Sequence, residues 1–162
     1  MNEHKQLIAW LNDAYSMERS LTQVLENHTH DAGGFAEIHQ REEQHLIETQ
    51  GHAQQIERCL SILGEKPSTV KGMMGSAMGM IEGTAPGVFR DEIMKNVLMD
   101  YAAEHLEIAC YRSLITAANE LGQAEIARIC EQILKEEEAM AEWIEQRLPE
   151  ITRMSLHQTA NV

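Results

Sequence analysis

Two glutamates interrupt an apolar helical stripe in the middle of the second half of the chain. Val97, Tyr101 and Ile108 recur there at helical spacing. Glu104 occupies the stripe position between Tyr101 and Ile108, and Glu107 lies three residues further along the same face. Because an unpaired carboxylate is costly to bury, these side chains need a partner, which is a basic side chain, solvent or a metal ion.

Two other predicted helices carry a carboxylate in the same kind of position. Leucines and alanines form the stripe of the segment 5–27, and Glu18 takes one of its slots. Isoleucines dominate the stripe of the segment 123–147, and Glu137 occupies the stripe position at which the apolar pattern is interrupted. Each of these helices is therefore predicted to point one carboxylate inward.

The remaining helix, predicted over 35–64, has a polar inner face. His45, Glu48 and His52 follow one another at i, i+3 and i+7, so they lie along one side of the helix. Imidazole and carboxylate on one helical face are the donor types of a metal site, although polar core residues also fit this pattern.

The predicted turns bring these side chains to similar depth. With a turn near residue 121, Glu104 and Glu137 are almost equidistant from it and should meet. With a turn near residue 31, Glu18 matches the level of His45, and Glu48 lies about one turn beyond. The sequence thus predicts one layer of inward carboxylates from four helices, made of Glu18, Glu48, Glu104 and Glu137, with Glu107 adjacent.

A layer of this charge needs cations. No basic residue occupies a matching stripe position, and clustered carboxylates repel strongly in a low dielectric. Two divalent ions per chain would balance the charge. Oxygen-rich donors with one or two imidazoles favour iron, with manganese and zinc as alternatives.

Composition sets the class of protein. The chain has 162 residues, 43% of them hydrophobic, and a net charge of −13, which disfavours partners such as nucleic acid or anionic membranes. No apolar run reaches the roughly 20 residues of a membrane span, and the start of the chain does not read as a signal peptide. Three widely spaced cysteines are typical of reduced thiols. We expect a cytoplasmic protein.

The helical segments predict an all-α fold with one domain. Two hairpins, 5–64 and 90–147, are joined by a long Gly- and Met-rich crossover with one short helix around 72–81. A four-helix bundle with one long connection is the arrangement of ferritin-like folds. The domain is expected to span 1–151. Pro149 should end the last helix, and 152–162 should form a disordered tail.

Four motifs of this chain resemble the YciE/YciF family of ferritin-like stress proteins. They are DAYSME ending at Glu18, HLIET from His45, EHLEIACY from Glu104 to Tyr111, and LKEE ending at Glu137. The motif in the third helix is the most specific, and the similarity covers roughly residues 6–148. The resemblance implies a compact ferritin-like bundle, usually a homodimer, with a carboxylate-bridged dinuclear metal site rather than a cage that stores iron.

The chain departs from the wider di-iron pattern, in which a histidine follows a glutamate by three residues. After Glu48 the third position is Gly51, with His52 one residue later, and after Glu137 it is Met140. We rank His52 ahead of His45 as the predicted metal ligand. His52 follows Glu48 by four residues, and side chains at i and i+4 also share one face of a helix. The choice between these histidines, and between Glu136 and Glu137, stays open. The predicted metal ligands are Glu18, Glu48, His52, Glu104, Glu107 and Glu137.

Two functions fit this pattern. The first is a ferroxidase or an oxidoreductase that reacts with O₂ or peroxide at a dinuclear iron centre in a stress response, with Glu48 and Glu137 as bridging ligands. The second is a non-enzymatic helical stress or interaction protein, in which the acidic layer holds a structural metal or none. Two ions per chain would favour the first function, and one or none the second.

Overall fold

Four long helices make up the part of the chain that the computed structural model describes, residues 2–31, 36–68 and 92–160. They are α1 (Glu3–Asp31), α2 (Ala36–Ile62), α4 (Glu92–Glu120) and α5 (Ala124–Ala160). The predicted all-α class is confirmed, and α2 and α4 lie close to their predicted ranges, whereas α1 and α5 are longer than predicted. The predicted short helix at 72–81 lies outside the described residues.

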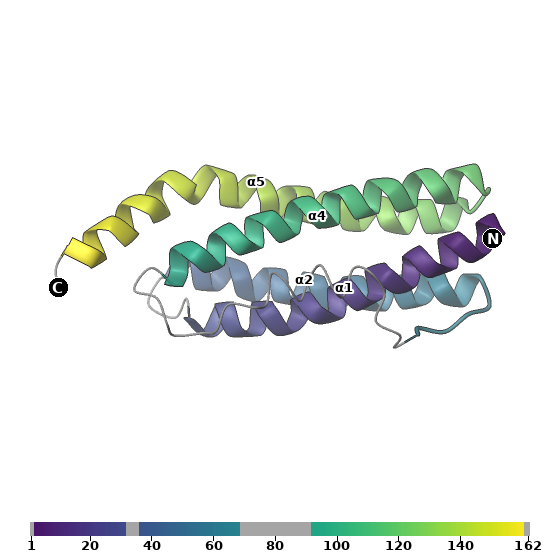
Figure 1. Ribbon diagram of the computed structural model, residues 1–162, viewed down its shortest axis with the longest axis horizontal. Helices are drawn as coiled ribbons and strands as arrows, with labels where there is room; N and C mark the ends of the chain where they lie inside the picture. Colours follow the sequence, from purple (N-terminus) through teal and green to yellow (C-terminus); the bar gives the residue numbers. More distant parts are fainter. Residues whose placement is uncertain (1, 32–35, 69–91, 161–162) are drawn as a thin grey trace.

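The helices form two antiparallel hairpins that pack against each other (Figure 1). α1 pairs with α2 and α4 pairs with α5, while α1 also contacts α4 and α2 contacts α5. α2 ends and α4 begins at opposite ends of the bundle, as Figure 1 shows. One long connection therefore joins the hairpins, as the sequence predicted.

Two glycines end helices in the left-handed conformation. Gly64 has φ +76° and Gly122 has φ +68°. The amide of Gln123 donates to the carbonyl of Ala118 at 2.8 Å, and the amide of Glu65 to that of Leu60 at 3.0 Å. These bonds close the last turns of α4 and α2, because glycine adopts positive φ without steric cost.

α1 is one turn longer than predicted. Residues 28–31, which the sequence pattern assigned to a turn, are helical. His28 Nδ1 lies 2.7 Å from Asp100 Oδ1 on α4, and Thr29 is buried, with its carbonyl 2.9 Å from His39 Nδ1. These tertiary contacts hold the last turn against the weak helix propensity of its residues.

α5 also continues past its predicted end. It passes through Pro149 and runs to Ala160, so residues 152–160 are helical where a disordered tail was expected. Ile151 is buried in a cluster with Ile144 and Val97, and Thr152 Oγ1 donates to the carbonyl of Leu148 at 2.7 Å. Burial beyond the proline offsets the missing backbone hydrogen bond, so Pro149 does not terminate the helix.

The core has two apolar parts with a polar layer between them. The larger cluster contains Leu11, Tyr111 and Ile133, and the smaller one contains Ile38 and Met140. Along α2, α4 and α5 the buried residues change from one cluster to polar side chains and then to the other. Across the described helices, none is long and apolar enough to span a membrane.

Candidate metal centre

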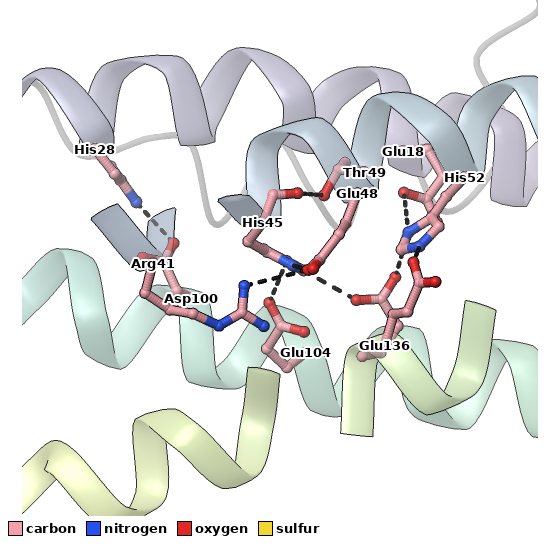
Figure 2. A network of polar contacts seen from close by, with 11 residues as sticks. Glu18, His28, Arg41, His45, Glu48, Thr49, His52, Asp100, Glu104 and Glu136 are labelled. Atoms are coloured by element: carbon pink, nitrogen blue, oxygen red, sulfur yellow. Dashed lines mark hydrogen bonds and ion pairs between the residues drawn. The ribbon is translucent and has the colours of Figure 1, made fainter. Parts of the chain in front are cut away.

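Both imidazoles of the polar layer come from α2. His45 and His52 are seven residues apart, so two helical turns place them on the same side, facing α4 and α5. Their side chains are 1% and 0% exposed. Figure 2 shows the two histidines with carboxylates around each.

The first group of donors surrounds His52. His52 Nδ1 lies 2.8 Å from Glu137 Oε1 and 3.7 Å from Glu18 Oε2. One potential ligand atom from each of the three residues lies within 4.8 Å of the others, and all three are buried. α1, α2 and α5 each contribute one of these residues.

The second group surrounds His45. His45 Nε2 lies 2.9 Å from Glu104 Oε1 on α4 and 3.8 Å from Glu137 Oε2 on α5. These three residues also offer ligand atoms within 4.8 Å of one another. Glu137 therefore belongs to both groups, with Oε1 toward His52 and Oε2 toward His45, which is the arrangement of a bridging carboxylate.

Glu107 completes the set from α4. It is 1% exposed, and the nearby Glu137, Glu18 and Glu104 influence its ionisation. Of the predicted ligands, the structure thus brings together all but Glu48. We call the following residues the acidic layer: Glu18, His45, His52, Glu104, Glu107 and Glu137.

Each layer histidine has a second carboxylate on its outer nitrogen. His45 Nδ1 lies 3.2 Å from Glu48 Oε2, and His52 Nε2 lies 2.6 Å from Glu136 Oε2. Such an outer carboxylate fixes the ring orientation and tautomer of a metal-binding histidine. Glu136 is 45% exposed whereas Glu137 is fully buried, so Glu137 is the layer residue of this pair.

Glu48 differs in placement from the sequence-based expectation that it bridges two ions. Besides His45, it accepts hydrogen bonds from Arg41 Nη1 at 3.2 Å and Gln44 Nε2 at 3.1 Å. Its side chain is 20% exposed and belongs to neither donor group. The turn of the first hairpin lies beyond Asp31, which brings Glu18 level with α2 residues closer to His52 than predicted. Glu48 lies outside the donor groups because of its direction, since Arg41 and Gln44 hold its carboxylate against the outer nitrogen of His45.

A tyrosine supports Glu18 from the opposite hairpin. The hydroxyl of Tyr111 on α4 donates to Glu18 Oε1, and both side chains are fully buried. Burial raises the pKa of the Tyr111 phenol well above its usual value, and the neighbouring carboxylates Glu18 and Glu137 raise it further. Tyr111 therefore stays a hydrogen-bond donor that fixes one ligand oxygen while leaving Oε2 turned toward His52.

Burial and mutual repulsion control ionisation within the layer. Desolvation raises the pKa of Glu104 to about 8 and that of Glu107 well above the ordinary value. Desolvation lowers the pKa of the histidines, but the carboxylates outweigh it, raising the pKa of His45 to about 10 through Glu104 and that of His52 to about 11 through Glu137 and Glu18. Without metal, the layer therefore holds protons at neutral pH.

The donor atoms are better arranged to bind divalent ions than to hydrogen-bond with one another. Several of them are buried and lack a hydrogen-bond partner of good geometry: Glu18 Oε2, His52 Nδ1, Glu104 Oε2, Glu107 Oε1 and both oxygens of Glu137. Buried polar atoms are normally satisfied, so orphaned oxygens that converge on two imidazoles indicate cation sites. Four carboxylates and two neutral imidazoles also balance the charge of two divalent ions.

The sequence pattern did not reveal the residues around the layer. It gave no indication that Arg41 pairs with Glu48, or that Asp100 pairs with His28. Glu136 was predicted only as a substitute for Glu137. The spacing of Arg41 and Glu48, i and i+7, is the signal that would have placed both on the side of α2 that carries His45.

Known proteins place this architecture in a family. The family model described as a domain of unknown function, DUF892, matches residues 2–157. The chain belongs to this family. YciF of Escherichia coli is 31% identical over 135 residues, which is 80% of each chain. The resemblance to the YciE/YciF family is therefore confirmed.

Solved structures agree with this assignment. A protein from Xanthomonas campestris pv. campestris is 36% identical, with a TM-score of 0.83 over 99% of both chains. The E. coli stress protein YciF has a TM-score of 0.73 over 100% of this chain and 99% of its own, at 24% identity. Ferritin-like, diiron-carboxylate proteins from Bacillus anthracis match with a TM-score of 0.74 and 19% identity, over 91% and 99% of the chains. The DUF892 chain thus has the ferritin-like fold.

Proposed function

We propose that this DUF892 protein binds two iron ions per chain in its acidic layer and acts as an oxidoreductase toward O₂ or peroxide, including oxidation of Fe²⁺. One observation carries the proposal. Glu137 directs one carboxylate oxygen into each of two buried His–Glu groups, with Glu18 and His52 on one side and His45 and Glu104 on the other. Two cation positions linked by one carboxylate are the donor arrangement of a dinuclear centre.

The bound ions would supply two exchangeable electrons to an oxidant at adjacent positions. The protein residues would orient and protect the centre. Glu48 and Glu136 hold the outer nitrogens of His45 and His52, so that the inner nitrogens face the layer. The apolar clusters on both sides keep the layer shielded from bulk water, which strengthens its electrostatic interactions.

Glu107 is the remaining carboxylate of this proposed ligand set. Its Oε1 is buried without a hydrogen-bond partner, so no hydrogen bond fixes that oxygen in one direction. It is close enough to Glu137, Glu18 and Glu104 for their charges to affect it. We assign it the part of a ligand that moves between the two ions as their charge changes.

Known relatives support the proposal by analogy. The Bacillus anthracis proteins are described as diiron-carboxylate proteins, and E. coli YciF as a stress protein. We extend both descriptions to this chain, together with a homodimeric state and a cytoplasmic location. Manganese or zinc would bind the same donors. Iron is our assignment because zinc has no redox chemistry and the Bacillus anthracis proteins are described as diiron.

The test is metal stoichiometry of protein loaded anaerobically with Fe²⁺, before and after O₂ or peroxide is added. The wild-type chain should retain two irons and show an oxidation-dependent charge-transfer band. Glu104→Gln should retain about one iron, because only the His45 group loses a donor. Glu137→Gln should retain fewer, because both groups share that residue.

The matched control is Glu138→Gln, which removes the neighbouring charge on α5. Glu138 is exposed and pairs with Arg112 outside the layer, so this variant should bind two irons like the wild type. Wild-type protein that retains no iron, or an equal loss in the control, would overturn the proposal. That result would favour the alternative, a helical interaction protein without a redox centre.

A further inference from the structure

A groove on the side of the bundle is lined by Arg41 and Gln44, the two residues that hold Glu48 beside His45. It has a volume of about 750 Å³ and is lined by residues of α1, α2 and α5. Ile47 and Trp143 form part of its apolar wall, and Glu26 and Glu43 are among its acidic residues. Arg41 lines the same groove.

The groove also contains a buried polar atom with no partner in the described part of the protein. Thr29 is 8% exposed and lines the groove, and its Oγ1 makes no hydrogen bond there. A buried hydroxyl of this kind needs a polar ligand such as water or a hydrated ion. With three glutamates, Glu26, Glu37 and Glu43, in the same lining, it makes the groove suited to hydrated cations.

Two lining residues connect the groove to the layer. Arg41 and Gln44 both line it, and both donate to Glu48, through Nη1 at 3.2 Å and Nε2 at 3.1 Å. Glu48 in turn contacts His45 Nδ1, and His45 Nε2 lies 2.9 Å from Glu104. Figure 2 shows this continuous path from Arg41 through Glu48 and His45 to Glu104.

We propose that divalent metal ions enter the acidic layer through this groove and that Arg41 is its gate, holding Glu48 in place until an arriving ion displaces the guanidinium. The inference rests on the proposed metal-binding function and assigns the route and the positioning residue of that site. Gln44 and His45 would keep Glu48 oriented while Arg41 moves aside.

The charges along the groove explain why a gate is needed. The acidic lining concentrates cations, but the guanidinium of Arg41, which lines the same groove, repels them. Arg41 is 18% exposed and Glu48 20%, so their ion pair is partly shielded from solvent screening. An ion that replaces Arg41 beside Glu48 satisfies the same carboxylate, so the exchange leaves no buried charge unpaired.

The experiment measures the rate at which metal-free protein takes up Co²⁺, followed by the absorbance of the bound ion in a stopped-flow instrument. Arg41→Gln removes the positive charge and keeps a hydrogen-bonding amide. Glu43→Gln removes one negative charge from the groove wall. The matched control is Glu57→Gln, which makes the same change on α2 in a separate groove lined by Tyr15 and Gln54.

We expect Arg41→Gln to take up Co²⁺ roughly threefold to tenfold faster than wild type and Glu43→Gln roughly twofold to threefold slower, with Glu57→Gln unchanged. The final stoichiometry should stay at two ions per chain in all three variants. Raising the salt concentration should shrink the Glu43 effect, because screening weakens the attraction of the groove for cations.

Unchanged rates in both Arg41→Gln and Glu43→Gln, or an equal slowing in Glu57→Gln, would overturn the gated route. Failure of the proposed function looks different, because wild-type protein would then bind no Co²⁺ at equilibrium. Fewer than two ions bound per chain in Arg41→Gln would also contradict the gate. Arg41 would then be needed to keep the ions bound, not to control their entry.

Discussion

Metal binding to the acidic layer should release at least about one proton per divalent ion. At pH 7 the layer histidines are protonated, because their pKa values are raised to about 10 and 11. Burial also raises the pKa of Glu104 to about 8 and that of Glu107 well above the ordinary value. Both imidazoles must lose a proton to act as ligands. Two ions per chain therefore displace at least about two protons.

The sign of the pH dependence follows from this count. Protons compete with the metal, so affinity should rise with pH, by at least about tenfold per ion for each unit between pH 6 and 7. Above pH 8 the slope should decrease, because Glu104 is then already ionised. Zinc is the suitable ion for this test, since it binds the same donors without redox chemistry.

The assay is calorimetric titration of Zn²⁺ into metal-free protein in two buffers with different ionisation enthalpies. The difference between the measured heats gives the number of protons released per ion. Surface carboxylates are ionised at pH 7 and release none when they bind an ion, so the measurement separates the layer from adventitious sites. Glu104→Gln should halve the total release per chain, because only the His52 group then binds an ion. A wild-type value below one proton per ion would refute the protonated state of the metal-free layer.

Three further predictions concern stability. The metal-free protein should become less stable as pH rises from 6.5 toward 10. The layer histidines have folded pKa values of about 10 and 11, above their unfolded value of 6.5, so they bind protons more tightly in the folded state. Urea unfolding at several pH values checks this, and a constant midpoint would contradict it. Tyr111→Phe removes the hydroxyl that donates a hydrogen bond to the buried Glu18, and it should lower the unfolding free energy of the metal-free protein by about 1–3 kcal/mol. The control Tyr101→Phe, at a half-buried phenol, should change the unfolding free energy by less than about 0.5 kcal/mol. Ile151→Ala should cost about 2–5 kcal/mol and make the end of α5 sensitive to limited proteolysis, while Met154→Ala, at an exposed position, should do neither; equal effects in the two variants would show that burial of Ile151 does not hold the helix end.

Helical periodicity was sufficient to predict the bundle and most of the layer. Glu104 and Glu137 meet as predicted, because the turn between α4 and α5 is short and ends at a glycine whose position is visible in the sequence. Glu18 was also correctly placed inside, since it interrupts a leucine stripe. In each case the side chain lies in a stripe, so the backbone pattern alone determines its direction.

Position along α2 was harder to predict. His28 and Thr29 look like turn residues, yet contacts with α4 and α2 keep them helical and shift the hairpin turn. That shift brought His52 within reach of Glu18, whereas Glu48 is turned toward the outer nitrogen of His45. Tertiary contacts of this kind leave no mark in local propensity, so the levels of the α2 side chains could not be derived from the sequence.

The division of donors between the hairpins bears on how the protein assembles. The α1–α2 hairpin carries Glu18 and both histidines, whereas the α4–α5 hairpin carries Glu104, Glu107 and Glu137. Neither hairpin contains either of the two complete groups of three donors. A chain emerging from the ribosome could not build these groups after its first hairpin had formed, and would gain them only when the second hairpin docked. Metal capture would then act as a check on completed folding, since an ion bound in either group stabilises only the docked state.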